Sequence, residues 1–240
     1  MRFRKGSYII ILLNILTTIG ITQNWGGMQL IDWFNPPNSF MGYFNPSYCD
    51  AESLLYFDDF YRMIQDHSSQ IYSTKIDTIY FYQMNWTDPI PLPYPINIEG
   101  YLNAMACVNE TNDTMYFASN RPGTRGGMDL WYSIKISDDW QEPVNLGDSI
   151  NTEYDEFKPY YAKNSGLLFY ERSPVSWHNY IYVSEIQDGV WQAGEILPDV
   201  INNNPGNYTM GTFFDETESA LYYSYHYPDS ISRETSEIYF

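Results

Sequence analysis

The sequence predicts an all-β protein, a β-propeller of about four four-stranded blades. Three observations predict it: short β-rich runs bounded by turn residues, a fixed Trp-to-Asn interval, and an aromatic pair that returns along the chain. The interval is eleven residues in every case, from Trp86 to Asn97, from Trp140 to Asn151 and from Trp191 to Asn202. Self-similarity at a fixed period indicates an array of one small structural element.

The aromatic pair ends an apolar run in each repeat, and it recurs at steps of 60, 53 and 53 residues. It occurs as Tyr56-Phe57, Tyr116-Phe117, Phe169-Tyr170 and Tyr222-Tyr223. Together, the two landmarks divide the chain into four repeats, at about 47–97, 104–151, 156–202 and 208–240. We therefore expect one propeller domain over residues 23–240, after an N-terminal segment of different character.

Each repeat is long enough for four strands. In the second repeat we expect them at 104–108, 115–119, 130–136 and 140–146, separated by Gly-, Pro-, Asn- and Asp-rich turns. The third repeat follows the same plan, with strands at 157–162, 167–170, 180–185 and 191–197. A solenoid of strands is the competing architecture, but its repeats are shorter and rarely contain three reverse turns.

One segment also fits another pattern. Apolar residues between Leu54 and Ile64 lie at helical spacing. The repeat register instead makes 54–57 a strand, so we expect 58–66 to be a loop.

The second repeat carries specific sequence motifs. These are the run from Phe117 to Trp131 (FASNRPGTRGGMDLW), the run WQEPVNLG from Trp140, and the later Asp155-Glu156. They resemble the TolB-type, WD-like β-propeller repeat of bacterial envelope proteins, closely over 104–162 and more loosely over 163–202. The resemblance implies a propeller in a periplasmic or secreted protein. It does not define an activity, because members of one fold differ in function.

The last repeat ends at a residue of its third predicted strand. The interval from Trp25 to Asn35 is ten residues, close to the repeated eleven, so this segment could supply the missing strand and protect the sheet edge. The alternative is that the chain is a fragment of a larger ring. The sequence leaves both possibilities open.

The first 22 residues have the pattern of a signal peptide. Arg2, Arg4 and Lys5 precede an apolar run over 8–16, followed by small or polar residues through Thr22. The run is shorter than the ~20 residues that span a bilayer. We expect an exported bacterial protein, periplasmic or secreted, with no membrane insertion after signal removal.

The mature chain is strongly acidic. Removal of 1–22 would leave 9 basic and 30 acidic residues, a formal net charge of −21 in place of −18. Such a surface repels nucleic acid, which excludes that class of partner. Cys49 and Cys107 fall near the first strands of adjacent repeats, but the sequence decides neither a disulfide between them nor the oligomeric state.

No sequence motif for catalysis is present. There is no nucleophile motif, phosphate loop or calcium loop, and the three histidines are too far apart in sequence for a local zinc motif. We therefore expect no catalytic residue, metal or cofactor.

Loop length suggests where binding occurs. The second-to-third strand connections are expected to be long, at 58–69, 120–128, 171–179 and 225–234, and to share one rim with the segments that join blades. The candidate binding residues on this rim are His67, Arg121, Arg125, Tyr154, Asp155, Glu156, Trp177, His178, Tyr225 and His226. For Arg121, Asp155 and Glu156 we favour hydrogen bonds that hold blades together, and for Trp177-His178 packing and recognition are evenly balanced.

A second set of residues is expected to be structural. It comprises Trp86, Asn97, Asp129, Trp140, Asn151, Trp191 and Asn202. Asp129 should accept hydrogen bonds from the amides of the Gly126-Gly127 loop, which lack sheet partners.

The combined prediction is an exported, non-catalytic propeller scaffold or interaction module that binds an envelope or extracellular protein, or a glycan, through this rim. The alternative is a glycoside hydrolase-like propeller enzyme, which needs two carboxyl groups roughly 5 to 9.5 Å apart. Because the predicted first strands 104–108, 157–162 and 208–214 contain no carboxylate, we favour the non-enzymatic function.

Overall fold

The computed structural model describes residues 44–49, 52–59, 68–80, 83–109, 111–175, 178–202, 208–216, 219–228 and 234–239. The predicted signal peptide and the segment from Trp25 to Asn35 lie outside these ranges, so export and ring closure stay predictions. The regular secondary structure of the described chain is almost entirely strand, with one short helix, α3 (Asp199–Asn202). No helix within these ranges is long and apolar enough to cross a membrane.

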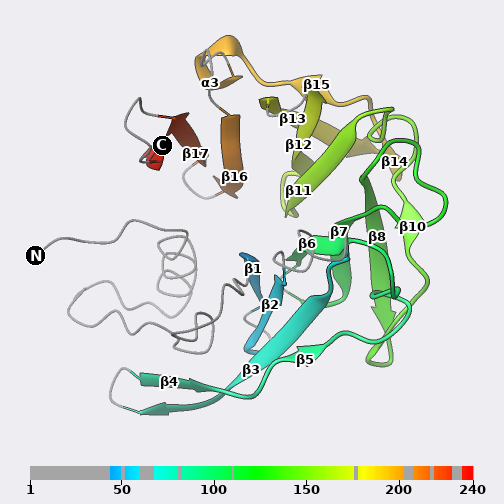
Figure 1. The fold of residues 1–240 in the computed structure, drawn as a ribbon, viewed down its shortest axis with the longest axis vertical. Helices are drawn as coiled ribbons and strands as arrows, with labels where there is room; N and C mark the ends of the chain where they lie inside the picture. The colour runs from blue at the N-terminus through cyan, green and yellow to red at the C-terminus, as the bar shows by residue number, and fades with distance from the viewer. Residues whose placement is uncertain are drawn as a thin grey trace, which may run out of the picture. The chain divides into compact units, whose positions relative to one another are not determined.

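Four antiparallel sheets follow one another along the chain (Figure 1). The first contains β1 (Phe44–Cys49), β2 (Leu54–Asp58), β3 (Ile71–Tyr80), β4 (Gln83–Trp86) and β5 (Ile90–Pro91). The second contains β6 (Asn103–Val108), β7 (Thr114–Ser119), β8 (Asp129–Ile136), β9 (Asp139–Trp140) and β10 (Val144–Asn145). The third contains β11 (Asp155–Ala162), β12 (Leu167–Val175), β13 (His178–Gln187), β14 (Val190–Trp191) and β15 (Glu195–Ile196). The fourth contains β16 (Tyr208–Asp215), β17 (Ala220–Pro228) and β18 (Glu234–Tyr239).

The first three sheets share one topology. Three strands form a meander, and a fourth strand, broken into two short pieces, pairs with the third strand through both pieces. The fourth sheet shows three strands within the described ranges. Successive antiparallel meanders of this kind are the blades of a β-propeller-like fold, so the predicted fold class is confirmed.

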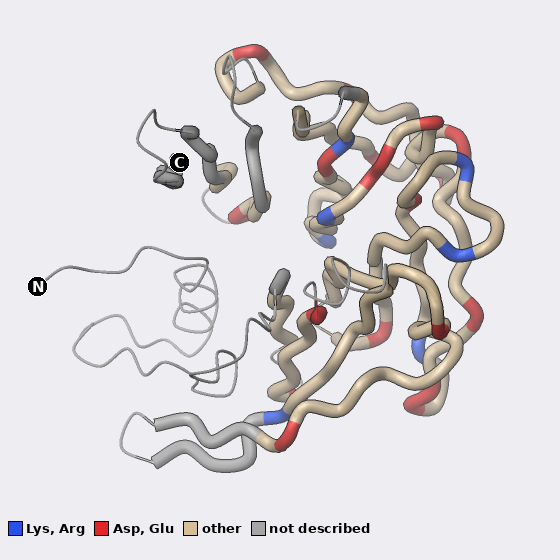
Figure 2. The backbone as a smooth tube through the Cα atoms, viewed as in Figure 1, with Lys and Arg blue, Asp and Glu red and all other residues tan. Residues whose placement is uncertain are grey.

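The chain divides into two compact units, and the division falls within the second sheet. Unit 1 comprises residues 1–115 and 133–143, and unit 2 comprises 116–132 and 144–240. Acidic positions outnumber basic ones along the described backbone of the chain, as its composition requires (Figure 2).

The Asn that ends each Trp-to-Asn interval binds the third strand of its own sheet. In unit 1, Asn97 Oδ1 accepts a hydrogen bond from Ile71 N at 2.9 Å, and Asn97 Nδ2 donates to Ile71 O at 2.9 Å and to Leu92 O at 2.7 Å. The carboxamide therefore satisfies both backbone groups of a fully buried strand residue. We call this arrangement the Asn clamp.

The Asn clamp is repeated twice in unit 2. Asn151 binds the N–H and C=O of Leu130 at 2.8 and 2.9 Å, and Asn202 binds those of Ile181 at 2.9 and 3.0 Å. Asn151 and Asn202 are buried, like Asn97. In a buried environment, a backbone N–H or C=O without a partner costs free energy. The eleven-residue interval is thus the distance between two fixed points of one blade.

The Trp at the other end of the interval lies at an equivalent register position in each sheet. Trp86 pairs with Ile76, Trp140 with Lys135 and Trp191 with Ile186. Each partner is five residues after the residue held by the Asn clamp. Residues of β3, β8 and β13 can therefore be matched one to one, counted from the residue that the Asn clamp holds.

The strand boundaries differ from the prediction in the third sheet. β11 begins at Asp155, two residues early, so a first strand does contain carboxylates, contrary to the sequence argument against an enzyme. The predicted loop 171–179 is largely strand, because Glu171 pairs with Ile181 and Arg172 with Tyr180. The prediction ends the strand with its apolar run at Tyr170, whereas the charged residues that follow are paired inside the sheet.

The two cysteines lie on first strands, as the repeat register predicts. Cys49 ends β1 and is buried, Cys107 lies on β6, and both are free thiols. The structure therefore contains no disulfide between them.

Candidate functional site

The loop between β7 and β8, residues 120–128, is held by a buried aspartate. Asp129 is fully buried, and it accepts hydrogen bonds from the backbone N–H of Arg125 at 2.9 Å and of Gly126 at 3.2 Å. Asn145 Nδ2 donates to the same carboxylate at 2.8 Å. The expected acceptor role is therefore present for Gly126, while the second amide belongs to Arg125 and not to Gly127.

The two glycines allow this loop to lie against the segment before β11. A Cβ at Gly126 would come within 2.0 Å of Tyr154 O, and one at Gly127 within 2.2 Å of Asp155 Oδ1. The Asp155 carboxylate also accepts a hydrogen bond from Met128 N at 2.8 Å. Any side chain would push the two segments apart, so glycine is required here for close approach rather than for flexibility.

Arg121 lies inside unit 2 instead of at its surface. Arg121 is 3% exposed, and its Nε donates a hydrogen bond to Ser119 Oγ at 3.1 Å. Its guanidinium lies over the rings of Phe117 and Trp131, at 4.7 and 5.5 Å from their centroids. The structure thus gives Arg121 a packing role.

Glu156 is also committed to the interior. It is fully buried and accepts hydrogen bonds from Thr152 N at 3.1 Å, from Thr152 Oγ1 at 2.6 Å and from Arg172 Nε at 2.8 Å. Burial raises the pKa of Glu156, and the bonds from Thr152 and Arg172 lower it only in part, so its pKa stays above the ordinary value. A second buried carboxylate, Glu171, forms an ion pair with Lys158 at 3.3 Å.

Three charged residues of the interior were not predicted from the sequence: Glu171, Arg172 and Lys158. A recognisable signal was the Glu171-Arg172 pair that directly follows the aromatic pair of the third repeat. In an alternating strand such neighbours lie on opposite faces, so each would need its own partner.

Other rim candidates remain exposed. Arg125 forms an ion pair with Asp148 at 2.6 Å, with side chains 50% and 86% exposed, and this contact raises the pKa of Arg125. Tyr154 is 39% exposed. Gly126, in the same loop as Arg125, lies directly against the backbone of Tyr154. The structure therefore brings these two candidates to one region of unit 2.

The remaining rim candidates cannot be combined into a site. His67 and Trp177 lie outside the described residues, and for Tyr225 and His226 only the backbone, on β17, is described. His178 is the first residue of β13, where it pairs with Val175. Within the described part of the chain, no group of three or more His, Cys, Asp or Glu side chains could hold a metal ion.

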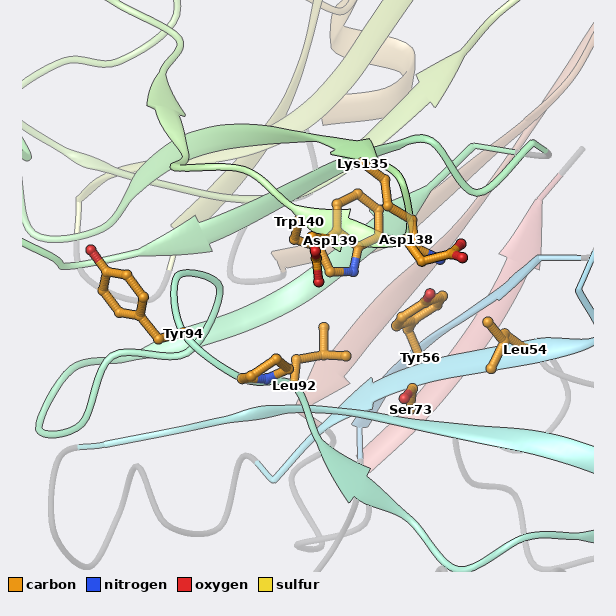
Figure 3. Close-up of a pocket in the computed structure, with 10 residues that line it drawn as sticks. Leu54, Tyr56, Ser73, Leu92, Tyr94, Lys135, Asp138, Asp139 and Trp140 are labelled. Carbon is orange, nitrogen blue, oxygen red and sulfur yellow. The ribbon is translucent and has the colours of Figure 1, made fainter.

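Unit 1 contains a pocket of about 360 Å³ (Figure 3). Figure 3 shows Leu54, Tyr56 and Ser73 of the first sheet, with Leu92 just after β5, on one side of the pocket. On the other side lie residues of the β8–β9 hairpin, namely Lys135, Asp138, Asp139 and Trp140, and Tyr94 lies at one end. Tyr94 is 69% exposed and donates a hydrogen bond to Glu142. The sequence analysis did not find this pocket.

The floor of the pocket is fixed by buried aromatic residues. Tyr56 is 2% exposed, its hydroxyl donates to Asn112 Oδ1 at 2.8 Å, and burial raises its pKa. Trp140 is 9% exposed. The Lys135 ammonium lies 5.7 Å from the Trp140 ring centroid and 3.5 Å from the carboxylate of Glu52.

Comparison with solved structures finds similarity to the crystal structure of TolB from Acinetobacter baumannii, at 9% sequence identity and a TM-score of 0.48. The match covers 82% of this chain and 41% of the TolB chain, so the chain spans less than half the length of that protein. The sequence matches no protein-family model and no curated protein. The assignment of a β-propeller-like fold therefore rests on the strand pairing described above.

Proposed function

We propose that this chain is a non-catalytic interaction module, exported from the cell, that binds an envelope protein or glycan through the rim formed by loop 120–128 and the segment 152–155. The observation that carries the proposal is the contrast within this rim. Its backbone is fixed by Asp129 and Asp155, whereas the side chains of Arg125 and Tyr154 are exposed.

A fixed loop with exposed side chains is suited to binding. Ordering a loop on association costs free energy, and a loop already held by internal hydrogen bonds avoids that cost. Arg and Tyr are also the residue types that contribute most at protein interfaces. The rim thus has both the rigidity and the side chains that recognition needs.

The state of the buried carboxylates supports a non-catalytic function over glycoside hydrolysis. A glycosidase needs one carboxylic acid and one carboxylate that both reach the substrate. Glu156 and Glu171 are both fully buried, and each forms an ion pair with Arg172 or Lys158. Both side chains are held by partners within the third sheet and do not face solvent. Hydrolysis is the second candidate function because β11 begins at Asp155 and so places carboxylates on a first strand.

The test is a binding experiment with rim variants. The purified protein is immobilised and exposed to a detergent-solubilised bacterial envelope fraction and to a glycan array. We expect retention of specific partners that the double variant Arg125→Glu, Tyr154→Ala weakens at least about tenfold, or about 1.4 kcal/mol. The matched control is Lys163→Glu, an exposed charge reversal on the β11–β12 turn, which should leave retention unchanged.

Two outcomes would contradict the proposal. The first is retention that is the same in the double variant and in the control. The second is turnover of a chromogenic glycoside that Glu156→Gln abolishes while the fold is preserved, because this would establish the hydrolase instead.

A further inference from the structure

The pocket of unit 1 has no part in the proposed function, which acts through a rim in unit 2. Its volume, about 360 Å³, falls in the range of small-molecule sites. Such sites combine apolar and aromatic walls with a few placed polar groups. The chemistry of the lining residues therefore bears on which class of ligand it would take.

Several polar groups of the lining have no partner among the described residues. The Ser73 hydroxyl and the Trp140 indole N–H make no hydrogen bond to any described residue, and the carboxylates of Asp138 and Asp139 have no cation partner in the described chain. Lys135 adds an ammonium donor, 3.5 Å from Glu52. The pocket thus offers both hydrogen-bond donors and acceptors to a ligand.

The rest of the lining is apolar. Tyr56 and Trp140 supply ring surfaces, and Leu54 and Leu92 lie on the same side as Tyr56 (Figure 3). Aromatic faces carry partial negative charge and favour contact with C–H groups. A ligand that complements this wall needs an apolar face in addition to hydroxyl groups.

The mixed charge of the pocket excludes simple ions as the best ligands. A cation would meet the ammonium of Lys135, and an anion would meet the carboxylates of Asp138 and Asp139. Bringing like charges together in a site partly shielded from water is unfavourable. A neutral ligand with many hydroxyl groups can donate to the carboxylates and accept from the ammonium and the indole N–H.

The equivalent position in unit 2 is filled by side chains. The Asn clamp holds Ile71 and Leu130, and two residues further along the strand stand Ser73 in unit 1 and Tyr132 in unit 2. Opposite the repeated Trp, Lys135 in unit 1 corresponds to Ile186 in unit 2.

The rings of unit 2 pack closely where unit 1 has its pocket. Tyr116, the equivalent of Tyr56, lies with its ring centroid 6.2 Å from Tyr132, 5.0 Å from Tyr161 and 6.1 Å from Trp191. Unit 1 thus has a small hydroxyl residue, Ser73, where unit 2 has the ring of Tyr132, and a charged residue, Lys135, where unit 2 has Ile186. In unit 2 the ring of Tyr161 fills further space.

We propose that this pocket of unit 1 is a carbohydrate-binding site that takes one neutral sugar residue. The ring of Tyr94, which is 69% exposed, contacts the apolar face of the sugar, and the buried Tyr56 and Trp140 form the floor of the site. Ser73, Lys135, Asp138 and Asp139 bind its hydroxyl groups. The site is distinct from the rim, so it can be tested without reference to the proposed function.

The test is titration of the full chain with neutral methyl glycosides of common hexoses and of N-acetylglucosamine, followed by saturation-transfer NMR and tryptophan fluorescence. We expect at least one to bind with a dissociation constant on the order of 1 mM or tighter. Ser73→Tyr, which copies the residue of unit 2, should weaken binding at least tenfold without lowering the melting temperature.

Matched variants separate pocket binding from general effects. Ser149→Tyr places the same ring at an exposed position of unit 2, and Arg125→Glu alters the rim; both should leave sugar affinity unchanged. If Ser73→Tyr fails to fold, the double variant Asp138→Asn, Asp139→Asn replaces two charged acceptors with weaker neutral ones without added volume and should weaken binding about tenfold. A short oligosaccharide compared with its terminal methyl glycoside shows whether the site prefers a free sugar or a chain end.

Three results would overturn the proposal. One is that no glycoside binds. Another is binding that neither the Ser73 variant nor the double Asn variant changes. The third is binding of methylguanidinium or tetramethylammonium in place of the sugars, sensitive to Ser73→Tyr, because the site would then take a cation.

Discussion

The same position differs between the two compact units. In unit 1 it contains Ser73 and Lys135 beside Trp140, and a pocket remains. In unit 2 the equivalent Tyr132 and Ile186 stand near Trp191, and aromatic rings occupy the space. The backbone around both positions is alike, because each third strand is held by an Asn clamp.

The difference shows which parts of a repeat carry its fold and which are free to change. The Asn clamp satisfies buried backbone groups, and no other side chain chemistry replaces it easily. The residues on the faces of neighbouring sheets only need to fill volume, so a smaller one can leave a site at a moderate cost. Four predictions test this division, beginning with the largest expected effect.

The tryptophans should differ in their contribution to stability. Trp191→Ala removes a ring packed against Tyr116 and Tyr161, and we expect a loss of about 3 to 5 kcal/mol in the free energy of unfolding. Trp140→Ala should cost about 1 kcal/mol less, because part of its surroundings is already open. Urea denaturation measures both, and equal losses would show that the pocket does not distinguish the two units.

The Asn clamps, in contrast, should be equivalent. Asn97→Ala and Asn151→Ala each leave a buried N–H and C=O without a partner, and we expect each to cost about 2 to 4 kcal/mol. The two losses should agree within about 0.5 kcal/mol in the same denaturation assay. Asn164→Ala, on an exposed turn, is the control and should cost far less. A clear difference between the two losses in unfolding free energy would contradict the inference that the repeats share one backbone arrangement.

The loop of the rim should depend on Asp129. Asp129→Ala leaves the amides of Arg125 and Gly126 without an acceptor, and we expect a loss of about 1 to 3 kcal/mol. Hydrogen exchange should become faster for these two amides and stay unchanged for those of the Asn151 clamp. Uniform acceleration across unit 2 would mean that Asp129 supports the whole unit and not the loop alone.

The smallest effect concerns two glutamates of unit 2 whose pKa values shift in opposite directions. Partial burial raises the pKa of Glu216. Hydrogen bonds from Ser165 and Asn164 lower this pKa by more, so that it lies below its ordinary value. Its contribution to stability should be present at neutral pH and lost as pH falls below about 4.3.

Glu156 should show the reverse dependence, because burial raises its folded pKa. The folded state holds the proton more tightly, so its contribution declines as pH rises through that pKa. The measurement is the difference in unfolding free energy between the wild type and each Glu→Gln variant from pH 3 to pH 7. The same sign of slope for Glu216 and Glu156 would contradict both assignments.

The period of the chain was predictable because it reflects backbone geometry. Trp140 and Asn151 mark one register position and one buried hydrogen-bond site, and a strand of fixed length separates them. Asp129 was predictable for a related reason, since a loop with unpaired amides requires an acceptor.

The charged residues of the third sheet and the pocket were harder to predict. Glu171 and Arg172 look like loop residues because strands seldom bury charges, and partners such as Lys158 and Glu156 make their burial possible. The pocket is present because unit 1 has Ser73 where unit 2 has an aromatic residue. This difference can be recognised only after the repeats are aligned through the Asn clamp.

The Asn clamp has a consequence for how such a chain can diversify. After duplication, each copy inherits a complete scaffold whose backbone bonds do not depend on the side chains that face its neighbour. Binding sites can then arise or disappear by a few substitutions without a new fold. To give unit 2 the recognition chemistry of unit 1, Tyr132 would become Ser, Ile186 would become Lys, and Gly189 and Val190, which stand where unit 1 has Asp138 and Asp139, would become acidic.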